Sequence, residues 1–170
     1  MIAVIGATGK LGRALLQKPD TIVCPVRFED AEDYQQWFDD NPDVDTVWHV
    51  ARACRKTGVR RDYKTFTLEK TAMKKLLQTR ASACRFVYAS TKVVYGIVNE
   101  STPLSAGTTS ESFNEGNGIE NFPAWKQSTS IDISGLGKEH KIYALTKLVC
   151  EKLIKDYCKN YKIIRIWDII

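Results

Sequence analysis

The sequence predicts an α/β fold in which a doubly wound parallel sheet carries helices on both faces. Short apolar segments typical of buried strands alternate along the chain with amphipathic segments typical of helices. The first apolar segment, residues 1–5, runs directly into a glycine-rich turn and a helical segment, the arrangement found at the ligand-binding edge of such sheets. The length of 170 residues and the hydrophobic content of 44% suit a single domain, residues 1–170, with a substantial core.

Strands are expected wherever a short run of apolar and β-branched residues lies between turn signals. The segments that meet this description are residues 1–5, 21–26, 45–50, 84–89 and 161–167. Helices are expected between the strands. The first ends near residue 18 and the second begins after residue 33. The other two span residues 62–79 and 140 to about 160.

Two of the helices carry a clear apolar face. Behind the acidic cap of residues 30–33, three aromatic side chains recur at helical spacing, namely Tyr34, Trp37 and Phe38. In the helix at 62–79 the expected inner face consists of Phe66, Met73, Leu76 and Leu77. Both helices are therefore expected to lie on the sheet.

Residues 105 to about 137 break this alternation. The segment is rich in Ser, Thr, Gly and Asn, with scattered aromatic residues such as Phe113 and Trp125. A connection of this length in a compact domain is usually functional or disordered. We expect an irregular insertion, part of which packs on another surface.

The composition narrows the class of protein. No apolar run approaches the length of a membrane span, and the N-terminus lacks the basic region of a signal peptide. The five cysteines form no Cys-x-x-Cys pair and only two histidines accompany them, so no metal site is expected. Reduced thiols in a cytoplasmic protein are the simplest interpretation of these cysteines.

The net charge of +5 comes partly from basic residues within segments 52–61 and 74–75. No aromatic residues alternate with these cations, so a nucleic acid is an improbable partner. Solvated surfaces, or attraction of an anionic cofactor or substrate, account for the charge more simply.

The glycine-rich turn, Gly6 to Gly12, offers a site for a dinucleotide. Gly6 allows a tight turn after the strand, Gly9 lets a pyrophosphate approach the backbone, and Gly12 lets the helix pack close to the sheet. The helix N-terminus then faces the phosphates. The phosphate loop of ATP-binding proteins does not fit, because position 4 is Val4 where that loop needs glycine. An ordinary turn between strand and helix remains the alternative.

Two further motifs follow in the chain. Residues 86–96 read Phe-Val-Tyr-Ala-Ser-Thr-Lys-Val-Val-Tyr-Gly, and Tyr143 and Lys147 stand four residues apart at the start of the last long helix. With the glycine turn, these motifs resemble the extended short-chain dehydrogenase/reductase family, which comprises NAD(P)-dependent epimerases, dehydratases and reductases of nucleotide sugars. The resemblance covers nearly the whole chain and implies a Rossmann-like NAD(P)-binding domain.

Tyr143 and Lys147 suit acid–base chemistry. Their spacing places both side chains on one face of a helix. A free phenol has a pKa of about 10, and a nearby ammonium lowers that pKa by stabilising the phenolate. Tyr143 can then exchange a proton with an alcohol or carbonyl while a hydride moves to or from nicotinamide. A surface tyrosine and a solvated lysine remain the alternative.

The resemblance implies roles for further residues. Lys147 would also bind the hydroxyls of the nicotinamide ribose, and Thr91 would hydrogen-bond the reacting oxygen, with Ser90 as the second choice for that role. The implied cofactor-binding set is Gly6, Thr8, Gly9, Lys10, Leu11, Gly12, Arg27, Ala51 and Lys147. A homodimer formed through the helices at 62–79 and 143–160 is also implied.

The end of the second strand indicates which cofactor binds. An acidic residue there would bind the ribose 2′-hydroxyl of NAD, whereas this chain has Arg27. A guanidinium suits the 2′-phosphate of NADP. We expect NADP, with NAD possible.

Departures from the family pattern narrow the type of reaction that we expect. Lys92 and Val93 stand where dehydratases have an acidic pair, which favours an epimerase or a keto-sugar reductase over a dehydratase. Arg52 replaces an alanine and brings a cation to the cleft. The resemblance implies that family members are considerably longer and that their C-terminal part builds the nucleotide-sugar site, so we expect that lobe to be largely missing here.

Two functions follow from these observations. The first is an NAD(P)-dependent oxidoreductase or epimerase acting on a nucleotide sugar or a related carbonyl or alcohol. The second is a catalytically weak or inactive NAD(P)-binding regulatory or scaffold module, or a truncated relic. The intact set of Tyr143, Lys147 and Thr91 favours the enzyme, and the short C-terminus favours the module.

Overall fold

The computed structural model describes residues 1–52, 62–95, 118–122, 131 and 133–166. Its strands are β1 (Ile2–Ile5), β2 (Thr21–Cys24), β3 (Thr46–His49), β4 (Arg85–Thr91), β5 (Gly118–Phe122) and β6 (Tyr161–Ile166). Its α-helices are α1 (Lys10–Leu15), α2 (Asp33–Asp40), α3 (Tyr63–Leu77) and α4 (Lys138–Tyr157). Short 3₁₀ turns are η1 (Phe28–Asp30), η2 (Arg80–Ala83) and η3 (Lys92–Tyr95).

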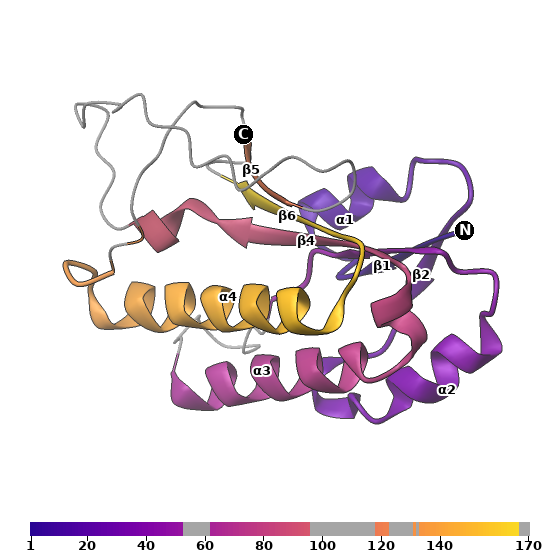
Figure 1. Cartoon of the computed structure of the whole chain (residues 1–170), viewed down its shortest axis with the longest axis horizontal. Coiled ribbons are helices and arrows are strands. Elements are labelled where there is room, and N and C mark those ends of the chain that lie inside the picture. The colour runs from indigo at the N-terminus through magenta and orange to yellow at the C-terminus, as the bar shows by residue number, and fades with distance from the viewer. Residues whose placement is uncertain (53–61, 96–117, 123–130, 132, 167–170) are drawn as a thin grey trace.

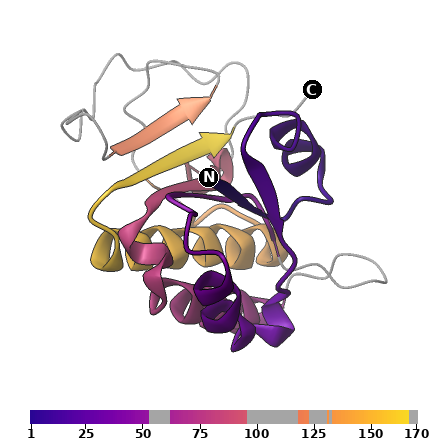
Figure 2. The same cartoon turned by 90° about the vertical axis from the view of Figure 1, so that its right-hand side faces the viewer.

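The strands form one sheet in the order β2-β1-β3-β4-β6-β5, and every pairing is parallel. Helices α2, α3 and α4 lie on one face and α1 lies on the other (Figures 1 and 2). This confirms the doubly wound α/β fold. The chain leaves β1 toward one edge through β2 and returns to build the other edge from β3, so the strand order reverses between β1 and β3. A crevice at the carboxyl ends of the strands is expected at such a reversal.

Each face of the sheet has its own apolar core, because side chains alternate along the strands. On the face covered by α2, α3 and α4, the core includes Ala3 and Ile5 of β1 together with Met73, Leu76 and Ile154. On the other face a smaller cluster joins α1 to the sheet through Val4, Ala7 and Leu15. The sheet is thus held between two apolar layers.

The apolar faces expected from the sequence are largely buried. Tyr34 and Phe38 of α2 are buried, and Trp37 packs against the same core. On α3, three of the expected residues are buried and Phe66 is half-buried. The start of α3 is fixed by Asp62, whose carboxylate accepts from the backbone N–H of Thr65 at 3.0 Å, while the Thr65 hydroxyl accepts from the backbone of Asp62 at 3.1 Å.

The segment expected to be irregular contains a strand. β5 pairs in parallel with β6 at the edge of the sheet, from Gly118 opposite Lys162 to Phe122 opposite Ile166. Gly, Glu and Asn are depleted in strands, so the sequence of β5 carries a weak strand signal and backbone pairing with β6 supplies the order. The rest of the expected insertion, residues 105–117, 123–130 and 132, lies outside the described residues.

Candidate functional site

The glycine turn fits tightly between β1 and the residues that follow β3. Gly6 has φ +95°, in the left-handed region that favours glycine, and a Cβ there would lie 2.5 Å from the backbone nitrogen of Ala51. A Cβ on Gly12 would lie 2.2 Å from the carbonyl oxygen of Gly6. At Gly9 the nearest protein atom to a Cβ would be 3.7 Å away. Packing within the chain therefore requires glycine at positions 6 and 12, but not at position 9.

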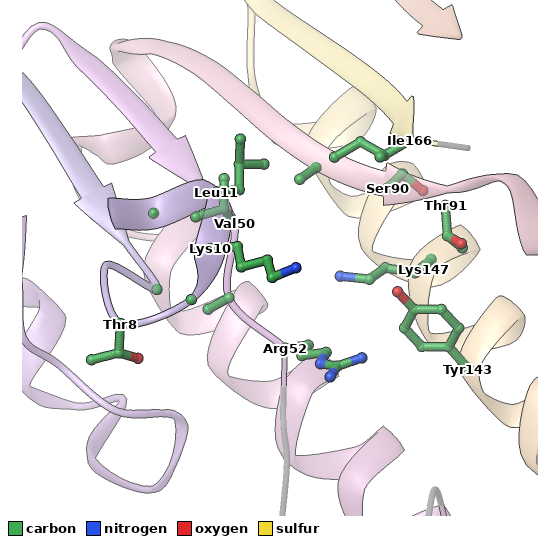
Figure 3. A pocket seen from close by; sticks show the side chains of 15 residues that line it. Thr8, Lys10, Leu11, Val50, Arg52, Ser90, Thr91, Tyr143, Lys147 and Ile166 are labelled. Carbon is green, nitrogen blue, oxygen red and sulfur yellow. The ribbon is translucent and has the colours of Figure 1, made fainter. Parts of the chain in front are cut away.

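A cavity of about 620 Å³ opens beside this turn, where the carboxyl ends of β1, β3, β4 and β6 meet (Figure 3). It lies at the strand reversal between β1 and β3. The lining residues come from the turn after β1, the segment after β3, the end of β4, the start of α4 and the end of β6. Three motifs that are far apart in the sequence are thus brought to one place.

Apart from Arg27, every residue that the sequence assigned to the site lines this cavity. These residues are Gly6, Thr8, Gly9, Lys10, Leu11, Gly12, Ala51, Ser90, Thr91, Tyr143 and Lys147. Lys10 and Lys147 extend toward one another from opposite walls, and the Arg52 guanidinium lies below their facing ends in this view (Figure 3). This concentration of positive charge suits an anionic ligand.

Arg27 lies in a second cavity of about 430 Å³ at the end of β2. Its lining also includes Phe28, Tyr34, Ala51 and Arg52. Gly6, Thr8, Ala51 and Arg52 line both cavities, so the two adjoin along the glycine turn. An elongated ligand could therefore run from Arg27 past the turn to Tyr143.

Lys147 is buried in the wall of the larger cavity, with 2% of its surface exposed. Its Nζ lies 3.3 Å from Oε1 of Glu69 on α3 and 4.8 Å from the centre of the Tyr88 ring. Burial acts to lower the pKa of Lys147, but the Glu69 carboxylate and the neighbouring Tyr143 outweigh it, and the net pKa is raised above 10.5. The side chain is therefore a buried ammonium rather than a solvated lysine.

Tyr143 and Thr91 lie at the same end of the cavity as Lys147 (Figure 3). Tyr143 is half-buried, and the centre of its ring is 5.8 Å from the Lys147 ammonium. The Thr91 hydroxyl, at the end of β4, accepts from the backbone N–H of Val93 at 3.3 Å. A phenol, an ammonium and a hydroxyl thus share one wall, which is a set of groups able to move a proton.

The Ser90 hydroxyl is engaged with the interior. It donates to Oε1 of Glu151 on α4 at 2.5 Å. Arg165 of β6 donates to the same carboxylate through Nε at 3.1 Å and Nη2 at 2.7 Å, so the ion pair is bidentate. All three side chains are buried. This network ties the ends of β4 and β6 to α4 and leaves Thr91 as the better placed of the two hydroxyl residues for a ligand.

Sequence reasoning missed the two buried glutamates, Glu69 and Glu151. The helical spacing that runs through Phe66, Met73 and Leu76 also includes position 69, so it places Glu69 on the inner face of α3. A charged residue at an inner position of a helix is the signal that could have identified Glu69, because a charged residue is rarely buried unless it is paired with another group. The partner itself could not be read from the sequence.

The described residues contain no group of three or more His, Cys, Asp or Glu side chains arranged to hold a metal ion. Nor does that part of the chain include a helix long and apolar enough to cross a membrane. The basic residues of the segment at 53–61, Cys54 and Trp167 lie outside the described residues.

Known structures share this fold over nearly the whole chain. The dTDP-4-dehydrorhamnose reductase of Yersinia enterocolitica is 20% identical, with a TM-score of 0.62, and the match covers 99% of this chain and 53% of the reductase. The enzyme of the same name from Bacillus anthracis, in complex with NADP, is 17% identical, with a TM-score of 0.60 and coverage of 98% and 52%. The UDP-glucuronic acid 4-epimerase of Bacillus cereus, in complex with NAD, is 20% identical, with a TM-score of 0.57 and coverage of 98% and 56%.

The chain therefore spans about half the length of these proteins. No curated protein matches it in sequence. The profile of the NAD dependent epimerase/dehydratase family, however, matches residues 2–167. With the doubly wound sheet and the glycine turn already established, this match shows that the chain belongs to the NAD-dependent epimerase/dehydratase family.

Proposed function

We propose that the chain binds a nicotinamide dinucleotide across its two adjoining cavities and uses Tyr143 as the acid–base group of an epimerase or keto-sugar reductase. The observation that carries the proposal is the meeting of Tyr143, Lys147 and Thr91 with the glycine turn in one cavity. Each of these features is common alone. Their convergence at the strand reversal is what an enzyme of this family would need.

The residues present suit the cofactor. Gly9 carries no side chain although packing within the chain leaves room for one, so a ligand that approaches the backbone there accounts for it. Backbone N–H groups of the turn and the ammonium of Lys10 would bind the pyrophosphate, and Lys147 would donate to the hydroxyls of the nicotinamide ribose. The adenosine would lie in the cavity at the end of β2.

The chemistry divides between cofactor and protein. A bound nicotinamide supplies or accepts a hydride. Tyr143 moves the proton at the substrate oxygen, and the buried ammonium of Lys147 favours the phenolate that this transfer requires. Thr91 donates a hydrogen bond to the same oxygen and orients it. Glu151 holds Ser90, so Ser90 acts as a support for this end of β4.

We propose NADP as the preferred cofactor. Arg27 is exposed at the end of β2, and Arg52 lines the same cavity. A 2′-phosphate bound between two guanidinium groups would gain charge-assisted hydrogen bonds that the 2′-hydroxyl of NAD does not make. NAD remains the weaker alternative ligand.

The proposed substrate is a nucleotide sugar, or a related carbonyl or alcohol. This follows from the family and from the reductases and the epimerase whose fold the chain shares. The chain spans about half of those proteins. The second candidate is a cofactor-binding module with weak or no turnover. For the compartment we propose the cytoplasm, because the four described cysteines are free thiols; a disulfide in protein purified with its thiols blocked would contradict this.

Tyr143→Phe separates the two candidates. In an enzyme the substitution should reduce turnover of a keto-sugar nucleotide about 10²- to 10⁴-fold, because the proton donor is lost. The affinity for NADPH should change by less than about threefold, because the ring is kept. Tyr157→Phe, an exposed tyrosine on the same helix, is the matched control and should have no effect.

Stopped-flow turnover and fluorescence titration of the same samples give both quantities. An equal loss of turnover and NADPH affinity in Tyr143→Phe would reject the acid–base role. Tight NADPH binding by the wild type with no turnover of any keto-sugar nucleotide would favour the binding module.

A further inference from the structure

Glu69 of α3 forms a buried ion pair with Lys147 of α4, whose side chain lines the cavity. Both helices contribute side chains to one apolar cluster, which includes Met73, Leu76, Cys150 and Ile154. At the level of the cavity, Glu69 faces Lys147 instead, and their side chains are 4% and 3% exposed.

Stability does not account for this pair. Removing two charges from water costs about as much free energy as their attraction returns, and apolar side chains of similar volume often stabilise such a site as well or better. The cluster that the two helices share is already apolar. The pair is therefore better explained by what it does to the Lys147 ammonium, which lines the cavity.

We propose that Glu69 is a positioning residue, which fixes the Lys147 ammonium at the cavity wall and maintains its charge. This inference rests on the proposed function, because the ammonium has its role only toward a bound cofactor and Tyr143. An ammonium has three N–H donors. The bond from Nζ to Oε1 of Glu69 uses one of them and so orients the others.

Several titratable groups surround Lys147. They are Glu69 on α3, His49 on β3, Tyr88 on β4, and Tyr143 and Cys150 on α4, with Lys10 and Arg52 across the cavity. Glu69 is the only carboxylate in this set. Burial raises the pKa of Cys150 to about 12 and lowers the pKa of His49 to about 3, so both are neutral near pH 7. Glu69 thus supplies the negative charge that offsets the burial of Lys147.

The direction in which Glu69→Gln should change the pKa of Lys147 follows from these two causes. Burial lowers the pKa of Lys147 and the Glu69 carboxylate raises it. In Glu69→Gln the burial remains and the charge is lost, so the pKa of Lys147 should fall. The ammonium of the variant then loses its proton at a lower pH than that of the wild type. The NADPH affinity of the variant should therefore weaken more steeply as the pH rises.

The test combines two measurements on the full chain. The ¹³Cε chemical shift of Lys147, assigned by its absence in Lys147→Arg, reports titration of the ammonium without any cofactor. Fluorescence titration with NADPH from pH 6 to pH 9 reports binding. In Glu69→Gln the Lys147 transition should move down by about two pH units or more, and the NADPH affinity should fall more steeply toward pH 9 than in the wild type.

Two variants complete the design. Glu69→Asp keeps the charge and should retain the wild-type pH dependence of NADPH binding. Glu151→Gln is the matched control, because Glu151 is as buried as Glu69 and paired with Arg165. It should destabilise the fold without moving the Lys147 transition. If Glu69→Gln does not fold, the wild type and Glu69→Asp decide: Lys147 titrating below 10.5 in the wild type, or steep pH dependence in Glu69→Asp, would overturn the proposal.

The outcomes distinguish this inference from the function on which it rests. If the wild type fails to bind NADPH at every pH, the proposed function fails and the positioning role falls with it. If the wild type binds NADPH and Glu69→Gln leaves both the Lys147 transition and the pH dependence unchanged, the proposed function stands and the role of Glu69 is wrong.

Discussion

His49 is a buried polar side chain at the end of β3. It has no exposed surface, and its ring lies among Phe28, Phe86 and Tyr88, with centroid distances of 5.9, 6.4 and 5.5 Å. Neither ring nitrogen has a hydrogen-bond partner among the described residues. Burial, and then the Lys147 charge, lower the pKa of His49 from 6.5 to about 3. The folded protein therefore keeps this imidazole neutral.

This environment predicts a contribution of His49 to acid denaturation. Between pH 6.5 and about 3 the unfolded chain binds a proton at His49 that the folded chain does not, so stability falls as the pH is lowered through this range. The loss approaches about 1.4 kcal/mol per pH unit. His49→Phe should remove this part of the pH dependence and leave stability at pH 7 equal or about 1 kcal/mol higher, because an unpartnered polar group is removed.

Urea unfolding at pH 4, 5, 6 and 7 measures the effect, with the exposed His140→Gln as the control that should not change the slope. A loss of more than about 2 kcal/mol at pH 7, with the acid dependence intact, would mean that the His49 nitrogens are hydrogen-bonded.

Helix α1 depends on one close contact. The helix has only six residues, Lys10–Leu15, and packs on the sheet through Leu15. A Cβ on Gly12 would lie 2.2 Å from the carbonyl oxygen of Gly6 and 2.6 Å from the Cα of Ala7, and these backbone atoms cannot move without displacing the turn. The position of the turn is thus set by the absence of a side chain at Gly12.

Gly12→Ala should therefore destabilise the fold by roughly 1–3 kcal/mol and weaken NADPH binding by at least about tenfold. Gly135→Ala is the matched control, since a Cβ at Gly135 would meet no atom within 4 Å. It should change stability by less than about 0.5 kcal/mol. Thermal unfolding and fluorescence titration measure the two effects. Equal behaviour of the two variants would mean that α1 shifts freely and does not fix the turn.

The elements that the sequence could predict are those whose own residues carry the pattern. β1 to β4 and β6 are apolar runs, and the register between parallel strands then brings their carboxyl ends, and hence Gly6 and Thr91, to one edge. β5 was missed because its order comes from pairing with β6. The ion pair of Lys147 with Glu69 was missed because 78 residues separate the partners and only the fold brings them together.

At the scale of the whole molecule, α3 and α4 present apolar side chains to the outside. Tyr63 is 71% exposed, and Leu145 and Tyr157 are 36% and 39% exposed. An open groove of about 530 Å³ also runs along α3 beside Tyr63 and Leu68. Because these helices lie together on one face of the sheet, we propose that they form the interface of a homodimer (Figure 2).

Leu145→Glu should then dissociate the dimer without unfolding the chain, because it places a charge in the interface. Ile131→Glu is the control, since Ile131 is 50% exposed and lies outside both helices. Sedimentation equilibrium of the wild type and both variants gives the molecular mass. A monomeric wild type, or a dimer that survives Leu145→Glu, would contradict this interface.

The central claim is that a nicotinamide dinucleotide binds along the glycine turn, with its adenosine beside Arg27. Titration of the purified chain with NADPH and NADH, followed by nicotinamide fluorescence, tests it most directly. We predict micromolar affinity for NADPH, weaker affinity for NADH, and loss of that preference in Arg27→Ala, because the guanidinium would contact only the 2′-phosphate. Absence of binding by either nucleotide would contradict the account and leave the glycine turn with a structural role alone.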